Sequence, residues 1–224
     1  MIEVTAIDQK EIYRYLGYGD STPDSATARL VNETEKQLLA VISPRYIYRF
    51  FQISPAAEGV RLDNGKLLLP GTDISAHLQG CRQAALMAAT LSTATDRLLR
   101  KLQIHDMARA AVANSAANTA IEQVCDAVAE KIHQRMPTLY QTFRFSPGYG
   151  DLPIHIQKDF LNVLDAPRKI GLVVTPDNIM VPEKSISAII GLSEQPLQKK
   201  RRGCRDCNLR EHCMFRLKGA HCAS

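Results

Sequence analysis

The sequence predicts an α+β domain with long helices and a mainly antiparallel sheet, followed by a small C-terminal metal-binding appendage. Helical periodicity dominates residues 8–41 and 92–136. Strand-like segments outside these helices come in pairs separated by turn signals, which is typical of antiparallel hairpins. Four cysteines lie close together near the C-terminus. Helices and strands in separate runs favour the α+β class.

The composition is that of a globular protein. The 224 residues are 45% hydrophobic, enough for a large domain with appendages and a sizeable core. No apolar run approaches the roughly 18 residues that span a bilayer. The first residues do not combine a basic region with an apolar one, as a secretory signal does. We therefore expect a cytoplasmic protein that meets no membrane and whose thiols stay reduced.

Two helices are predicted at the start of the chain. Residues 8–18 read as a short helix that Gly17 ends. After a turn at Pro23, an amphipathic helix runs to about residue 41, and Pro44 stops it.

A strand and a hairpin follow these helices. Residues 45–53 are rich in Tyr, Phe and Ile, a composition that favours a strand. Residues 60–69 read as a hairpin in which Asn64-Gly65 supplies the positive φ angles of a type I′ turn.

The middle of the chain is mainly helical. A short helix over residues 73–80 is expected to take its cap from the residues just before it. Residues 84–90 are apolar and alanine-rich, and periodicity alone leaves strand or helix open. Residues 92–136 are helical in pattern, with Asp106 near a helix start and Pro137 at the end.

The last third contains shorter elements. Residues 144–153 form a loop full of helix breakers, and a helix of one or two turns covers residues 156–164. Residues 171–181 read as a hairpin, and residues 185–192 as a further strand.

The tail has a metal-binding pattern. Its cysteines are spaced Cys-x2-Cys-x5-Cys-x8-Cys, and four thiolates this close can surround one metal centre. They are Cys204, Cys207, Cys213 and Cys222. The net charge of +5 also belongs to this region, because residues 199–218 carry eight Lys and Arg against two acidic residues.

The spacing favours an iron–sulfur cluster over zinc. Structural zinc sites usually consist of two Cys-x2-Cys knuckles, and this tail has one such pair followed by wider gaps. Such uneven spacing is closer to that of a 4Fe-4S site. His212 and His221 flank the last two cysteines as substitute ligands, and zinc remains the alternative.

Two segments carry a resemblance to a known family. Residues 84–136 are followed by the motif Arg-x-x-x-Gly-Tyr at residues 144–149 and by Met-x-Pro-x-x-Ser-x-Ser at residues 180–187. Together they resemble the activation domain of cobalamin-dependent methionine synthase. With residues 14–18 near the start, the layout is similar to the free-standing versions of this domain.

The resemblance gives a division of the chain. Residues 1–69 would be N-terminal helices and a hairpin packing on the core. Residues 70–192 would be the activation-domain-like core, and residues 193–224 a basic linker and the four-cysteine metal tail.

What the resemblance implies is a C-shaped fold with a twisted sheet that binds S-adenosylmethionine (AdoMet). The family restores an oxidised corrinoid, the cob(II)alamin form of methionine synthase, by reductive methylation with AdoMet as methyl donor. The chain would act as a methyltransferase-associated activation subunit for methionine biosynthesis, and whether it is itself an enzyme stays open. A partner methionine synthase or other corrinoid protein would supply the cobalamin, and a low-potential donor the electron.

The loop chemistry suits AdoMet. Arg144 offers a planar fork for a carboxylate, and Tyr149 offers a flat ring for an adenine or a sulfonium. Gly148 lets the backbone approach a ligand. The resemblance adds backbone contacts of Ser146 and an acidic residue near the ligand at Asp126.

Two departures and three alternatives stand beside this interpretation. The loop is also compatible with a plain structural turn, and the family's tyrosine pair after the Met-x-Pro strand has no counterpart. Its N-terminal acidic contact has only Asp20 or Asp24 as unaligned candidates. A different class is a non-catalytic, zinc-clipped module that binds nucleic acid through residues 199–202, although the tail offers only Phe215 for stacking. A degenerate AdoMet-binding scaffold is the third alternative.

Overall fold

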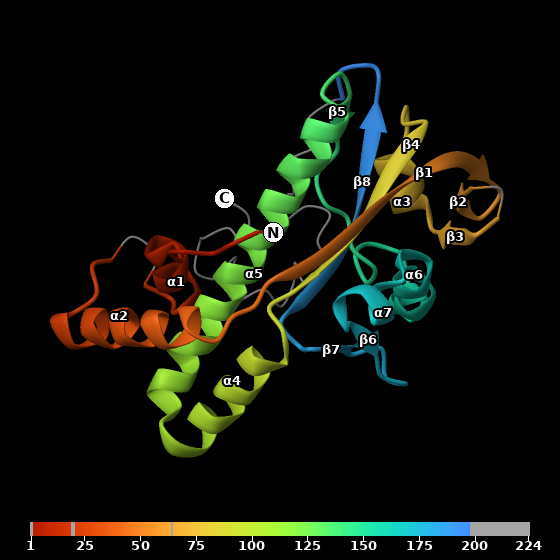
Figure 1. The fold of residues 1–224 in the computed structure, drawn as a ribbon. Coiled ribbons are helices and arrows are strands. Elements are labelled where there is room, and N and C mark those ends of the chain that lie inside the picture. The colour runs from red at the N-terminus through yellow and green to blue at the C-terminus, as the bar shows by residue number, and fades with distance from the viewer. Residues whose placement is uncertain (1, 19–20, 64, 198–224) are drawn as a thin grey trace. The chain divides into compact units, whose positions relative to one another are not determined.

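The computed structural model describes residues 2–18, 21–63 and 65–197 (Figure 1). The predicted metal ligands Cys204, Cys207, Cys213 and Cys222 lie outside the described residues. Within these ranges the chain contains long helices and antiparallel strand pairs, and the predicted α+β class is confirmed. None of the described helices is long and apolar enough to cross a membrane.

The principal sheet has the strand order β3-β2-β1-β4-β8-β5. The strands are β1 (Arg45–Ala56), β2 (Gly59–Leu62), β3 (Leu67–Pro70), β4 (Gln83–Thr90), β5 (Tyr140–Gln141) and β8 (Ser185–Ser193). The pairs β1–β2, β2–β3 and β5–β8 are antiparallel. A separate antiparallel pair joins β6 (Val173–Val174) to β7 (Met180–Val181) and confirms the hairpin predicted there.

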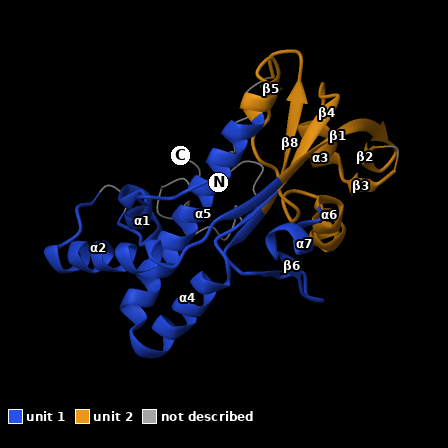
Figure 2. Cartoon of the chain, in the orientation of Figure 1, with its two compact units in different colours: residues 1–47, 88–132, 165–186 blue, residues 48–87, 133–164, 187–224 orange. Residues whose placement is uncertain are grey.

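The chain divides into two compact units, coloured separately in Figure 2. Unit 1 comprises residues 1–47, 88–132 and 165–186. Unit 2 comprises residues 48–87 and 133–164 and, among the described residues, 187–197.

Unit 1 is mainly helical. Its helices are α1 (Gln9–Tyr15), α2 (Ser25–Leu39), α4 (Thr93–His105), α7 (Ala166–Ile170) and most of α5 (Met107–Arg135). Helix α5 buries a series of alanines, among them Ala113, Ala116 and Ala117 at 0% exposure. Small side chains let neighbouring elements approach this helix closely.

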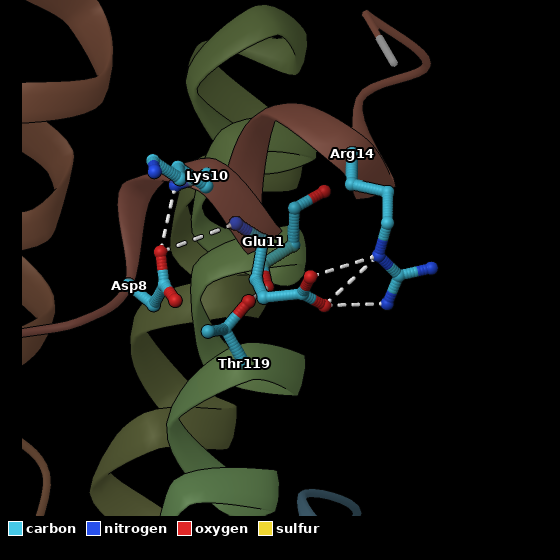
Figure 3. A network of polar contacts seen from close by, with 6 residues as sticks. Asp8, Lys10, Glu11, Arg14 and Thr119 are labelled. Atoms are coloured by element: carbon cyan, nitrogen blue, oxygen red, sulfur yellow. Dashed lines mark hydrogen bonds and ion pairs between the residues drawn. The ribbon is translucent and has the colours of Figure 1, made fainter. Parts of the chain in front are cut away.

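Polar caps fix the N-terminal helices of unit 1. The Asp8 carboxylate accepts hydrogen bonds from the backbone N–H groups of Lys10 and Glu11, and Glu11 pairs with Arg14 at 2.6 Å (Figure 3). Such caps satisfy the N–H groups that a helix start leaves without partners. Asp24 caps α2 through the backbone N–H and hydroxyl of Thr27, so it serves the helix as an N-cap.

Unit 2 contains the β2–β3 hairpin, most of β1, β4 and β8, and the helices α3 (Thr72–His77) and α6 (Gln157–Leu164). Strand β4 is apolar from Ala84 to Ala89, and these side chains are fully buried. A strand buried on both faces does not alternate, which is why periodicity could not separate it from a helix.

Two local predictions are wrong. The register pairs Leu62 with Leu67, so four residues separate the hairpin strands where a type I′ turn would have two. Asp63 explains the longer connection, because its backbone N–H and its carboxylate both pair with Gln52 of β1. Gly65 has the expected positive φ of 112°, and Asn64 lies outside the described residues.

Helix α3 starts without a cap from its own N-cap residue, and Asp151 caps it instead.

Candidate functional site

The loop that follows Phe145 begins at a defined sheet contact. Phe145 and Ile189 of β8 exchange two backbone hydrogen bonds, of 2.9 and 2.7 Å, in an isolated antiparallel bridge. Arg144 stands directly before this bridge and is half-buried, with an interaction partner in the chain. The sheet therefore fixes the backbone from which the Arg144 side chain departs.

Two consecutive turns build the loop. The Tyr149 N–H donates to the Ser146 carbonyl at 3.0 Å, with Pro147 and Gly148 at the central positions. Gly148 has φ +91°, as the third residue of a type II turn requires. The Leu152 N–H then donates to the Tyr149 carbonyl at 3.0 Å, and the Gly148 N–H to the Leu152 carbonyl at 2.8 Å. The loop thus satisfies much of its own backbone, which lowers the ordering cost of binding a ligand.

The tip of the loop is open to solvent. Gly148 is exposed and Tyr149 is 44% exposed. The Tyr149 ring meets the Phe145 ring edge to face, with centroids 5.9 Å apart, and Phe145 is 7% exposed. A buried aromatic residue therefore contacts Tyr149, whose side chain stays partly exposed. A β-carbon at Gly148 would lie 3.4 Å from Ile154 Cδ1. With glycine, no side chain projects from the loop surface at this position.

His77 supports the site from the interior. Its ring lies 4.4 Å from that of Phe143 and 4.9 Å from that of Phe145, measured between centroids. His77 Nε2 is 2.8 Å from Thr142 Oγ1, and this hydroxyl accepts a hydrogen bond from the Gly191 N–H. His77 is 8% exposed, so its environment is that of a packed core histidine.

The predicted site residue Asp126 does not belong to this loop. It is exposed on helix α5 in unit 1, whereas Arg144, Ser146, Gly148 and Tyr149 belong to unit 2. The structure brings these four predicted residues together on one loop, and the assignment of Asp126 to the site stays a prediction.

Sequence reasoning missed the residue that anchors the loop. Asp151 accepts hydrogen bonds from Thr72 N, Thr72 Oγ1 and Asp73 N, at 2.6, 2.7 and 3.0 Å. The Thr72 hydroxyl, ahead of the backbone N–H groups, holds the pKa of the Asp151 carboxyl below its usual value. The resulting stabilisation is present above the unfolded value of about 3.9 and is lost as pH falls through the lower folded value. Its partner lies 78 residues away in the chain, so no local pattern announces the contact.

Metal ligation stays a prediction. Among the residues that the structure describes, no three or more His, Cys, Asp or Glu side chains are grouped as a metal site requires. The four tail cysteines are not among these residues, so neither the iron–sulfur cluster nor zinc is tested.

Comparison with known proteins identifies the family. No curated protein matches the sequence. The fold resembles a solved structure described as "Crystal Structure of the MetH Reactivation Domain bound to AdoHcy", with a TM-score of 0.64 and 15% sequence identity over 96% of this chain and 82% of the other. Residues 83–197 match the family model of the "Vitamin B12 dependent methionine synthase, activation domain". The chain therefore belongs to the family of vitamin B12-dependent methionine synthase activation domains.

Proposed function

We propose that the chain binds AdoMet at residues 144–152 and supports reductive methylation of an oxidised corrinoid on a partner protein. The observation that carries this proposal is the exposed, internally hydrogen-bonded loop with Arg144 at its base and Tyr149 at its tip. Family membership points to the same reaction. The solved relative is described as bound to AdoHcy, the product that AdoMet leaves after methyl transfer.

Each loop residue has a chemical role in this proposal. The Arg144 guanidinium would hold the AdoMet carboxylate in a charge-assisted pair. The partly exposed Tyr149 ring would lie against the adenine or the sulfonium. Ser146 and Gly148 would contribute backbone contacts, and Asp126 would be the acidic residue near the ligand.

The reaction requires a partner. Reductive methylation consumes one electron and the methyl group of AdoMet and leaves AdoHcy. The sequence has no Asp-x-His-x-x-Gly run of the kind that binds cobalamin, so we assign the corrinoid to a partner methionine synthase or a related corrinoid protein.

We further propose that the tail carries a 4Fe-4S cluster. Bound by Cys204, Cys207, Cys213 and Cys222, such a cluster would supply an electron at low potential. Anaerobic reconstitution followed by EPR spectroscopy tests this assignment. A reducible cluster is expected, and it should be lost in Cys207→Ser. A tail that takes up zinc and gives no reducible cluster would contradict it.

Calorimetry with AdoMet tests the binding site. We expect Arg144→Ala to weaken binding by about 1.5–3 kcal/mol, the range for a hydrogen bond to a charged group, or roughly 10- to 100-fold in Kd. Arg168→Ala is the matched control, because Arg168 is an exposed arginine that pairs with Asp165, three residues before it, and lies outside the loop. Equal affinities of wild type and Arg144→Ala would remove Arg144 from the site.

A further inference from the structure

Two short segments of unit 2, each with a glycine and an aspartate, form hydrogen bonds with one another. We call them the aspartate clasp: residues 71–73, at the start of α3, and residues 150–151, in the candidate ligand loop. Asp151 Oδ1 accepts from the Asp73 N–H at 3.0 Å, and Asp73 Oδ2 accepts from the Asp151 N–H at 3.0 Å. Asp151 Oδ2 also accepts from the N–H and the hydroxyl of Thr72. Each carboxylate thus binds the backbone of the other segment.

Each glycine makes room for the opposite carboxylate. A β-carbon at Gly71 would lie 2.3 Å from Asp151 Oδ1, and one at Gly150 would lie 2.2 Å from Asp73 Oδ2. Both glycines have positive φ, of 130° and 52°, which side chains rarely adopt. The clasp therefore requires glycine at two defined positions and aspartate at two others, and this makes it more than a single helix cap.

The clasp closes the free end of the ligand loop. The bridge between Phe145 and Ile189 anchors one end of the loop to β8, and Asp151 anchors the other end to α3. Ser146, Gly148 and Tyr149 lie between these two anchors. A loop held at both ends loses less conformational entropy when a ligand orders it.

The clasp also occupies the backbone donors at the start of α3. The N–H groups of Thr72 and Asp73 donate to Asp151, so an internal carboxylate already satisfies them.

We propose that the aspartate clasp preorganises the AdoMet loop, with Asp151 and Asp73 acting as positioning residues that do not touch the ligand. This inference rests on the proposed function of the loop. Removing the clasp lowers the fraction of molecules whose loop is ready to bind. The apparent Kd for AdoMet rises in inverse proportion to this fraction.

The test uses the full chain and two measurements. Hydrogen exchange of the Gly148 and Leu152 amides reports loop order without any ligand, because both donate within the loop. Calorimetry with AdoMet reports the consequence. In Asp151→Ala we expect exchange at these amides to accelerate on the order of tenfold and the Kd to rise roughly three- to tenfold. Gly150→Ala should behave alike, because its new β-carbon displaces Asp73.

Two controls separate positioning from general stability. Asp106→Ala removes a carboxylate that accepts from the Arg109 N–H at the start of α5 in unit 1, and it should change neither loop exchange nor AdoMet affinity. If Asp151→Ala does not fold, Thr72→Val removes a single hydroxyl donor, and Thr72→Ser should restore wild-type exchange and affinity.

The outcomes distinguish this inference from the proposed function. Unchanged loop exchange in Asp151→Ala and Thr72→Val would overturn it, as would faster exchange with an unchanged AdoMet Kd. If the wild-type chain does not bind AdoMet, the proposed function is wrong. Faster exchange in Asp151→Ala would then still establish that the clasp orders the loop.

Discussion

Two proline-containing segments stand out in the sequence, and the structure treats them in opposite ways. Residues 146–152 in unit 2 form an exposed loop that satisfies its backbone within its own turns and leaves Tyr149 accessible. Residues 180–185 in unit 1 are held by side chains of other elements. Both segments belong to motifs that resemble the same family.

The second segment has the contacts of a scaffold. The Glu183 N–H donates to Asp96 Oδ2 of α4 at 2.8 Å, and Asp96 is 6% exposed. Lys184 Nζ donates to the side-chain oxygens of Asn114 and Asn118, one turn apart on α5, at 2.6 and 2.8 Å. Ser185 Oγ donates to the carbonyl of Pro182 at 2.6 Å.

The difference teaches how to separate a ligand motif from a structural one. Residues 146–152, which we propose as the ligand loop, satisfy much of their backbone within their own turns and are tied to α3 through Asp151. Residues 183 and 184 bind the side chains of α4 and α5. Substitutions in the loop should therefore change ligand affinity, and substitutions around residues 180–185 should change stability.

The largest effect on stability is expected at Asp96. Asp96→Ala leaves the Glu183 N–H without its acceptor and should lower the free energy of unfolding by about 1–3 kcal/mol, because a partly buried group loses its hydrogen bond. Urea denaturation measures this loss. Asp96→Asn keeps an oxygen acceptor and should cost less. If Asp96→Ala changed the free energy of AdoMet binding by more than the free energy of unfolding, the two segments would not differ as stated.

A smaller effect is expected at Tyr149, with the opposite signature. Tyr149→Ala removes an exposed ring and should weaken AdoMet binding by about 0.5–1 kcal/mol, the range for a cation held over an exposed aromatic face. Its effect on stability should stay within about 0.5 kcal/mol. Tyr140→Ala is the control, because Tyr140 is 49% exposed on β5 and outside the loop. Calorimetry in which the two variants bind alike would argue against Tyr149.

The smallest effect is a pH dependence at Lys184. Burial is the main influence on the pKa of this amine and lowers it below its ordinary value, although Glu183 and Asp96 act in the opposite direction. The folded state then holds this proton less tightly than the unfolded chain does. Stability should rise as pH increases from the lowered folded value toward the unfolded value of about 10.4. Lys184→Met should lack this rise in urea denaturation series, and identical pH profiles would contradict the assignment.

Much of the fold was accessible from the sequence because its signals are local. The caps and periodicity of the long helices predicted α2, α4 and α5, and turn residues predicted both hairpins. Strand β4 remained ambiguous because complete burial removes alternation. Helix α7 was not predicted, since its five residues are too few for a periodic pattern.

The site divides along the same line. Arg144, Ser146, Gly148 and Tyr149 are consecutive enough to be read as one motif, and the structure places them on one loop. Asp151 lies in the same stretch, yet its role depends on residues at the start of α3. In the sequence this contact shows only as two glycines that each precede an aspartate by one or two positions. The fold is needed to see that the two segments pair.

Hydrogen exchange of the wild-type chain with and without AdoMet tests the central claim most directly. We expect AdoMet to slow exchange at the amides of residues 145–152 and to leave exchange at residues 180–185 unchanged. Protection of residues 180–185 in place of the loop, or no protection in either segment at saturating AdoMet, would contradict it.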